Sequence, residues 1–251
     1  MDLPAILVNN VSKTYEYNRK SMHILEKVSI NVKKGEFVSI LGPSGCGKST
    51  LLKMIPGLKK PDHGQVFLEG KSINGQITKV GYMAQKDLLA PWKTLLENIA
   101  LPLLINGTLR EKAYRDVRNL LPTFGLEGFE HHYPHQLSGG MRQRAALMRT
   151  ILIGSDVLLL DEPFAALDAL TRESMQEWLL GIWEKFSPSI LFITHSIDEA
   201  IFLSDKIYVL SKRPGRVILE EEIKLDRPRV RKIVTSSDFV HYKEILLEAL
   251  K

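Results

Sequence analysis

The sequence has a single cysteine, Cys46, so no disulfide can form within its 251 residues. A chain without disulfides is typical of a reducing compartment. Long apolar runs are also missing. The best candidate, near Leu101, contains a proline and is shorter than the roughly 18 residues that a bilayer-spanning helix needs. We therefore expect no membrane-spanning helix. Because the amino terminus has no basic start followed by a long apolar stretch, we also expect no secretory signal.

The composition shows no bias that would point to disorder, collagen-like repeats or a fibrous protein. Hydrophobic residues make up 44% and charged residues 25% of the chain, close to the average of globular proteins. The 34 lysines and arginines exceed the 29 acidic residues by a net charge of +5. This modest excess is compatible with a nucleic acid, an anionic membrane surface or an anionic small ligand, and by itself it selects none of them.

Short β-rich runs alternate with helical patterns along most of the chain. The predicted strands are 5–11, 24–32, 36–41, 65–68, 80–83, 157–160, 190–194 and 206–210. The predicted helices are 49–54, 138–153 with Ser138 as N-cap, 169–185, 197–203 and a run near 240–250, and 93–126 is mostly helical in period. The alternation of strands and helices after residue 157 favours βαβ units and a parallel sheet.

A glycine-rich loop follows the predicted strand 36–41. It fits the pattern G-x-x-x-x-G-K-[ST] with Gly42, Pro43, Ser44, Gly45, Cys46, Gly47, Lys48 and Ser49, and Thr50 follows in the predicted helix. Glycines let successive backbone N–H groups converge on phosphate oxygens, and the helix N-terminus adds its dipole. Lys48 would then bind the β- and γ-phosphates of a nucleotide, and the Ser49 hydroxyl would ligate Mg²⁺. The alternative is an unrelated glycine turn.

Two acids, Asp161 and Glu162, end the apolar run 157–160. In a parallel sheet they would lie at the carboxyl edge, where open α/β sheets bind their ligands. Asp161 is the candidate ligand of Mg²⁺, directly or through water, and Glu162 is the candidate general base for an attacking water. A strand that simply ends in a surface turn is the alternative, but the phosphate loop favours the catalytic interpretation.

The segment Leu137-Ser138-Gly139-Gly140-Met141-Arg142-Gln143 resembles the LSGGQ-type signature of ABC ATPases, with Met141 in the usual glutamine position. From about residue 6 to 223 the chain resembles the ATP-binding subunit of an ABC transporter. The resemblance implies an α/β fold: a P-loop NTPase (RecA-like) core, an N-terminal antiparallel β subdomain and an inserted α-helical signature subdomain. It implies one domain over 1–251, with the core at about 1–88 and 154–230, the helical insert at 89–153 and a short helical tail at 231–251.

Four further residues take their roles from the same resemblance. Tyr15 is similar to the aromatic residue that stacks on adenine, and Gln85 to the glutamine that contacts Mg²⁺ and the attacking water. Asp168 lies in a segment that resembles the D-loop, and His195 resembles the switch histidine that contacts the γ-phosphate. For an isolated tyrosine or histidine, ordinary packing is the alternative. The implied cofactors are ATP and Mg²⁺.

The signature implies a protein partner, because in this family it faces the phosphate loop of a second subunit. The Ser138 hydroxyl and the Gly140 amide, with Gly139 between them, would direct donors at a γ-phosphate from a helix N-terminus. The sequence contains one phosphate loop and one signature, so two chains, or this chain and a paralogue, would clasp two ATP molecules head to tail. We expect a homodimer in the ATP state.

The resemblance also implies membrane partners: transmembrane permease subunits and, indirectly, an extracytoplasmic solute-binding protein, with this chain at the cytoplasmic face of the membrane. The motifs are most similar to those of the nitrate, sulfonate and taurine importer group, which includes importers of thiamine pyrimidine precursors. The apolar stretch 88–92 is unexpected in a connecting loop unless something covers it. We expect Leu89 and Trp92 to help line a groove for a permease helix; the alternative is that Trp92 packs inside the insert.

Two rival functions fit the sequence less well. ATPase heads of chromosome-maintenance and DNA-repair proteins carry long coiled coils between phosphate loop and signature, whereas here about 90 residues without sustained heptads separate the two motifs. A non-hydrolysing adaptor would not need Glu162 and His195. We expect no nucleic-acid partner. The charge excess lies in 206–232, with nine basic and four acidic residues, which we expect to form a solvated basic face; contact with anionic lipid headgroups is the alternative.

Overall fold

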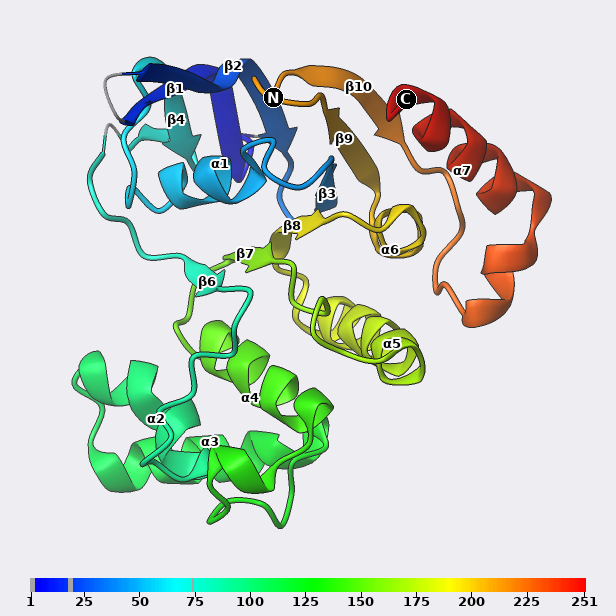
Figure 1. Ribbon diagram of the computed structural model, residues 1–251. Helices are drawn as coiled ribbons and strands as arrows, with labels where there is room; N and C mark the ends of the chain where they lie inside the picture. The colour runs from blue at the N-terminus through cyan, green and yellow to red at the C-terminus, as the bar shows by residue number, and fades with distance from the viewer. Residues whose placement is uncertain (1–2, 18–19, 74) are drawn as a thin grey trace. The chain divides into compact units, whose positions relative to one another are not determined.

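A computed structural model describes residues 3–17, 20–73 and 75–251, and the chain divides into two compact units (Figure 1). The first unit combines Met1–Lys79 with Gln176–Lys251, and the second is Val80–Met175. The predicted insert, 89–153, lies within the second unit. The first unit contains an antiparallel sheet and a largely parallel one, as the predicted α/β class requires.

The antiparallel sheet of the first unit contains four strands in the order β2-β1-β4-β5. They are β1 (Ile6–Tyr17), β2 (Lys20–Val32), β4 (His63–Leu68) and β5 (Lys71–Ser72). The two long strands extend beyond the predicted 5–11 and 24–32, because the polar residues after Val11 pair across to Lys20–His23. Cross-strand pairing of polar residues lengthens these two strands, and a search for apolar residues does not detect such pairing.

The core strands of the first unit are nearly continuous apolar runs. They are β3 (Phe37–Leu41), β8 (Ser189–Thr194) and β9 (Lys206–Leu210), and every residue in them is buried. β3 pairs in parallel with both neighbours, as expected of strands covered on both faces. The edge strand β10 (Val217–Glu222) pairs antiparallel to β9 and is not among the predicted strands, because its second half is three consecutive glutamates that break the apolar pattern.

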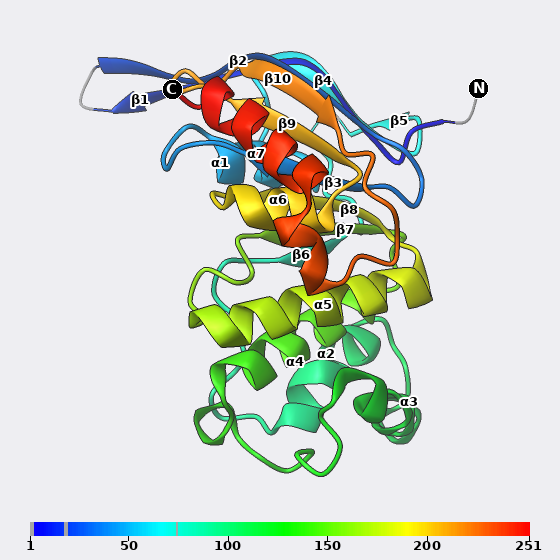
Figure 2. The ribbon, with the colours of Figure 1, turned by 90° about the vertical axis from the view of Figure 1, so that its right-hand side faces the viewer.

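Four helices belong wholly or partly to the first unit: α1 (Lys48–Met54), α5 (Ala169–Phe186, from Gln176 onward), α6 (Ile197–Leu203) and α7 (Ser237–Ala249). Helix α7 packs on α6 (Figure 2). An ion pair of 2.8 Å between Lys243 of α7 and Asp198 of α6 accompanies this contact. The carboxyl-terminal tail is therefore attached to the element that follows β8.

The second unit contains helices α2, α3 and α4, the start of α5, and two short parallel strands, β6 (Gly81–Met83) and β7 (Val157–Asp161). The predicted helical stretch 93–126 is two helices, α2 (Leu95–Ile105) and α3 (Arg110–Phe124), separated by a turn. Thr94 caps α2 in a capping box with Glu97. The predicted N-cap at Ser138 of α4 (Gly139–Ile151) is confirmed, since its side chain accepts from the Met141 amide.

Helices α2, α3 and α4 pack on one another around apolar side chains with no exposed surface, among them Ile99, Val117 and Met148. Across the described ranges 3–17, 20–73 and 75–251, we find no helix whose length and apolar character would let it cross a bilayer.

The basic segment 206–232 is not a uniformly solvated face, and that expectation is wrong for Lys206 and Arg229, which are buried. Arg229 is 4% exposed, and its guanidinium donates to the carbonyls of Ile201 in α6, of Ser204 at the end of α6 and of Leu225 in its own segment. Burial, and after it the nearby charge of Arg227, lower the pKa of Arg229 to about 10. Part of the charge excess therefore holds the tail onto the core instead of facing a partner.

Candidate functional site

The phosphate loop of the first unit turns from β3 directly into α1. Gly47, the N-cap of α1, has φ of +113°, and a Cβ there would lie 2.6 Å from the Leu25 side chain. Glycine is therefore required for both backbone conformation and space. The Lys48 ammonium is buried and donates to the carbonyls of Gly42 (2.7 Å) and Pro43 (3.0 Å). A cation folded over its own glycine loop at a helix N-terminus has the chemistry that a nucleotide phosphate needs.

Two other residues support the loop from within the first unit. The Cys46 thiol is buried, and burial raises its pKa although the Lys48 charge opposes the shift. It therefore stays protonated, in line with a structural role. Arg213, in the turn between β9 and β10, donates through Nη2 to the Gly45 carbonyl at 2.9 Å. The sequence analysis missed Arg213, because nothing in its local pattern indicates a contact 168 residues away.

Tyr15 lies on β1 opposite Met22 of β2, and Arg213 contacts the Met22 sulfur. The tyrosine is thus connected to the phosphate loop through a short series of contacts in one unit. Its ring is already flanked by the ammonium groups of Lys13 (5.6 Å) and Lys59 (5.8 Å). An adenine stacking on this ring would have to share or displace these cations.

His195 directly follows β8, which pairs in parallel with β3 so that Thr194 lies opposite Leu41. The next residues along the two strands, His195 and Gly42, therefore emerge at the same carboxyl edge. His195 is exposed there. The strand register supplies what the sequence left open: the histidine belongs to the edge that carries the phosphate loop.

The second unit repeats this arrangement with β6 and β7. Met83 pairs with Leu160, so Gln85 and the acidic pair leave two adjacent parallel strands at one edge. Asp161 is 6% exposed and accepts from the Tyr82 hydroxyl at 3.4 Å. Burial and then the Asp161 charge raise the pKa of Tyr82 well above its usual value, which keeps the phenol a donor.

Glu162 has φ of +46°, a left-handed conformation that a glutamate rarely adopts. Its carbonyl accepts from the Ala165 amide, which closes the turn after β7. Backbone strain of this kind costs about 1–3 kcal/mol and concentrates at functional sites. A buried carboxylate is thus followed by a glutamate in a strained backbone conformation, and the roles of metal ligand and general base for Asp161 and Glu162 stay predictions.

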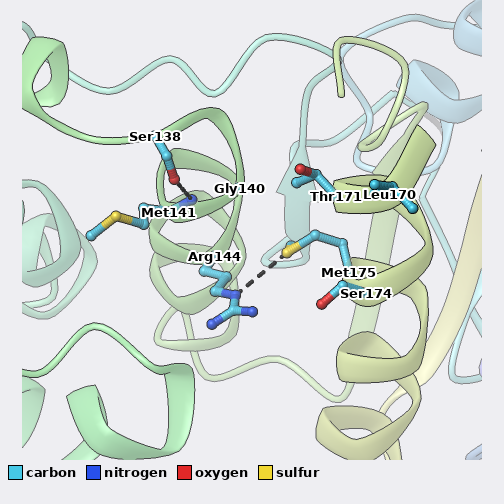
Figure 3. Close-up of a pocket in the computed structure, with 8 residues that line it drawn as sticks. All are labelled: Ser138, Gly140, Met141, Arg144, Leu170, Thr171, Ser174 and Met175. Carbon is cyan, nitrogen blue, oxygen red and sulfur yellow. Dashed lines mark hydrogen bonds between the residues drawn. The ribbon is translucent and has the colours of Figure 1, made fainter. Parts of the chain in front are cut away.

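The signature lies at the N-terminus of α4 and borders a cavity of about 410 Å³ within the second unit (Figure 3). Its lining comprises Ser138, Gly140, Met141, Arg144, Leu170, Thr171, Ser174 and Met175. Gly140 is buried, and a Cβ there would lie 3.2 Å from the Thr171 methyl. A glycine at this position therefore keeps the helix N-terminus accessible from the cavity.

Asp168 has a local role that the sequence analysis did not assign. Its carboxylate accepts from the Thr171 amide at 3.0 Å at the start of α5. Hydrogen bonds from the Thr171 side chain and backbone lower the pKa of Asp168. Arg172 donates to the carbonyls of Phe164 and Leu167 and so fixes the loop before it. The segment predicted as a D-loop is thus a braced turn that ends in a capped helix.

The connecting segment 85–93 is held by side chains from α2 and α4, which the sequence analysis also missed. Arg149 donates to the carbonyls of Asp87 (2.6 Å) and Leu88 (2.8 Å), and Arg142 pairs with the Asp87 carboxylate at 3.2 Å. Asn98, with no exposed surface, donates to the carbonyl and accepts from the amide of Ala90. Both arginines come from the helix that begins at the signature.

This anchoring leaves part of the segment facing outward. Trp92 is 76% exposed and Leu88 is 63% exposed, whereas Leu89 is buried at 7%. The alternative that Trp92 packs inside the insert is therefore wrong within the part of the chain that the structure describes. The expectation that Leu89 lines a groove is wrong too, because this side chain belongs to the interior of the second unit.

The predicted residues are divided between the two units. Tyr15, the phosphate loop with Ser49 and Thr50, and His195 belong to the first unit; Gln85, Ser138, Gly139, Gly140, Asp161, Glu162 and Asp168 belong to the second. Strand register brings the phosphate loop and His195 to one carboxyl edge in the first unit, and Gln85, Asp161 and Glu162 to one in the second. Among the missed residues, Arg142 had the clearest signal, because it stands inside the signature.

Comparison with known proteins gives consistent matches. A family model described as "ABC transporter" matches residues 25–165. The aliphatic sulfonates import ATP-binding protein SsuB of Bacillus cereus is 44% identical over 225 residues, which cover 89% of this chain and 88% of that protein. The formylaminopyrimidine import ATP-binding protein ThiZ of Halalkalibacterium halodurans is 44% identical over 209 residues, covering 83% of this chain and 82% of that protein. The dimeric post-hydrolysis state of the ATP-binding cassette MJ0796, bound to ADP and Pi, matches with a TM-score of 0.77 and 33% identity, covering 88% of this chain and 100% of that chain.

Proposed function

The chain belongs to the ABC transporter family of ATP-binding proteins, and we propose that it is the subunit that powers a solute importer as an ATP-dependent dimer. The family resemblance predicted from the signature is confirmed, as is the fold class. The chain is accordingly an ABC ATPase. The observation that carries the proposal is the strained Glu162 directly after the buried Asp161, in a chain whose phosphate loop holds a folded-back lysine.

Each residue has one physical task in the proposed reaction. Lys48 leaves its loop carbonyls to bind the phosphates, and the backbone N–H groups of the glycine loop orient them. Glu162 accepts a proton from the attacking water, and His195 donates a hydrogen bond to the γ-phosphate. Ser49, Gln85 and Asp161 are the oxygen ligands suited to Mg²⁺, which would supply charge neutralisation at the phosphates. Tyr15 supports the adenine.

The dimer follows from how the donors are distributed. The signature presents the Ser138 hydroxyl and the α4 N-terminus beside an open cavity, and the chain has a single phosphate loop. Two copies related by a two-fold axis would each supply the signature to the other's nucleotide. ATP would then hold the interface together, and hydrolysis would release it. The dimeric state of the similar cassette MJ0796 supports this proposal.

The exposed side chains of Trp92 and Leu88 are the proposed contact with a permease. Trp92 and Leu88 lie four residues apart in one segment and both expose most of their surface, and apolar side chains that gather on a surface mark interaction sites. The arginines that anchor this segment belong to the signature helix, so nucleotide-driven movement of α4 would reach the permease contact directly. The chain would accordingly work at the cytoplasmic face of the membrane, beside permease subunits fed by an extracytoplasmic solute-binding protein.

The cargo is proposed as a small solute of the sulfonate, taurine or nitrate type, or a thiamine pyrimidine precursor. Two relatives named for different cargoes are equally similar to this chain at 44% identity. Sequence similarity therefore does not choose between them, in keeping with selection of cargo by the permease and the solute-binding protein.

Replacing Trp92 by alanine tests this proposal in the assembled transporter. We expect solute uptake into proteoliposomes to fall about tenfold, since an anchoring aromatic is worth about 2 kcal/mol at an interface. ATP-dependent dimerisation of the chain alone should persist. Ile77→Ala, another exposed apolar residue (79%), in the first unit, is the control. Full uptake by the Trp92 variant would contradict the proposed contact.

A further inference from the structure

A buried hydrogen-bonded series in the first unit ends next to His195. Glu199 of α6 is 7% exposed, and its carboxylate accepts from the Thr194 hydroxyl at 2.5 Å and from the Gln176 amide at 3.1 Å. Thr194 and Gln176 are 1% and 2% exposed. Neither the phosphate loop nor the proposed hydrolysis uses these three polar side chains.

The series continues in both directions. At one end, the Thr194 oxygen accepts from the Ser196 amide at 3.0 Å, so one hydroxyl spans the backbone on both sides of His195. At the other end, the Gln176 oxygen accepts from the Arg231 guanidinium at 2.7 Å, and this guanidinium lies 5.2 Å from the Phe202 ring. The four side chains come from β8, α6, α5 and the tail, and we call them the histidine brace: Thr194, Glu199, Gln176 and Arg231.

The brace addresses a geometric problem at the end of β8. The backbone must leave the strand, present His195 to solvent at the carboxyl edge, and begin α6 two residues later. Such short turns are easily displaced, since few contacts hold an exposed residue. The Thr194 hydroxyl restrains the turn, because its oxygen accepts a hydrogen bond from the Ser196 amide. The buried Glu199 carboxylate in turn orients this hydroxyl, because it accepts the hydroxyl proton.

We propose that the histidine brace is a positioning device that sets the backbone, and hence the imidazole, of His195 for its contact with the γ-phosphate. This inference rests on the proposed role of His195. The four brace residues touch no nucleotide themselves and act only through the turn. Because Arg231 belongs to the carboxyl-terminal tail, the position of the turn at His195 also depends on the tail.

The test measures ATP hydrolysis by Thr194→Val, which removes the hydroxyl and keeps the size and the buried position. We expect kcat to fall about tenfold with KM for ATP within about twofold, because displacement of a catalytic group costs turnover more than ground-state binding. Thr194→Ser should restore kcat. Thr150→Val is the matched control, since Thr150 is a 3% exposed threonine of α4 whose hydroxyl donates to a helix carbonyl.

Arg231→Ala gives an independent reading if Thr194→Val fails to fold, and it should lower kcat about threefold in a chain that stays folded, which a thermal melt without nucleotide checks. The double variant Thr194→Val/His195→Ala should be no slower than His195→Ala alone. A further loss in the double variant, or equal loss in the Val and Ser variants of Thr194, would overturn the inference. His195→Ala with full turnover would contradict the role of His195, whereas a slow His195→Ala beside a fully active Thr194→Val would overturn the brace alone.

Discussion

The phosphate loop and the connecting segment 85–93 both hold irregular backbone, but they do so by different means. The loop is supported mainly by residues adjacent in sequence: Gly47 permits the turn, and Lys48 donates to carbonyls five and six positions back. The connecting segment takes its support from side chains outside it: Asn98 lies eight residues from Ala90, and Arg149 lies more than 60 residues from its partners. A self-supported loop leaves a sequence motif, whereas a segment supported by side chains of distant helices does not.

The loop's dependence on its own lysine gives the largest expected effect. Lys48→Ala should weaken ATP binding about 100-fold and lower turnover with it, because a charged hydrogen-bond donor to phosphate is lost. Calorimetric titration with ATP and a steady-state ATPase assay measure the two effects. Lys53→Ala serves as the control, since Lys53 is an exposed lysine of the same helix, α1. ATP affinity of the Lys48 variant near that of the unmodified chain would contradict the account.

In the connecting segment, Asn98 is the residue whose loss should have the largest effect. Its replacement should lower the free energy of unfolding and not the affinity for ATP. Asn98→Ala leaves the amide of Ala90 and the carbonyls of Ala90, Lys93 and Thr94 without their side-chain partner in a fully buried place. We expect the free energy of unfolding to fall by about 3 kcal/mol. Urea denaturation measures it, with exposed Asn106→Ala at the other end of α2 as control. Equal stability of the two variants would show that the segment is not held in this way.

Arg149→Ala should give the smallest effect, because Arg142 still anchors the segment through Asp87. We expect faster hydrogen exchange at 86–92 and about threefold lower turnover, since the segment begins at Gln85. Exchange measured by mass spectrometry, with exposed Arg118→Ala on α3 as control, locates the change. Unchanged protection of the 86–92 amides from hydrogen exchange would show that Arg149 does not hold this segment.

The same contrast explains what the sequence could and could not predict. Buried strands such as Phe37–Leu41 and the capped start of α4 at Ser138 were predictable, because apolar runs and N-caps are local signals. The break between α2 and α3 and the strand β10 were not, since the first interrupts one helical period and the second ends in three consecutive glutamates.

At the site, motif residues were predictable and their supports were not. Glu162 and Gly47 stand in recognisable patterns, whereas Arg213 and Arg149 contact backbone 168 and 62 residues away, and the histidine brace joins Gln176 to Glu199 across 23 residues. The net charge of a segment does not predict which of its basic residues are buried. Arg229 is an example, because its guanidinium donates to backbone carbonyls rather than to solvent or a partner.

The most direct test of the central claim is the mass in solution and the ATPase rate of Glu162→Gln. Glutamine keeps the size of the side chain and cannot accept the proton from water, so ATP should bind and turnover should fall at least about 100-fold. Light scattering with ATP should then report a stable dimer, and with ADP a monomer. A variant that hydrolyses ATP at the normal rate, or one that stays monomeric with saturating ATP, would contradict the account.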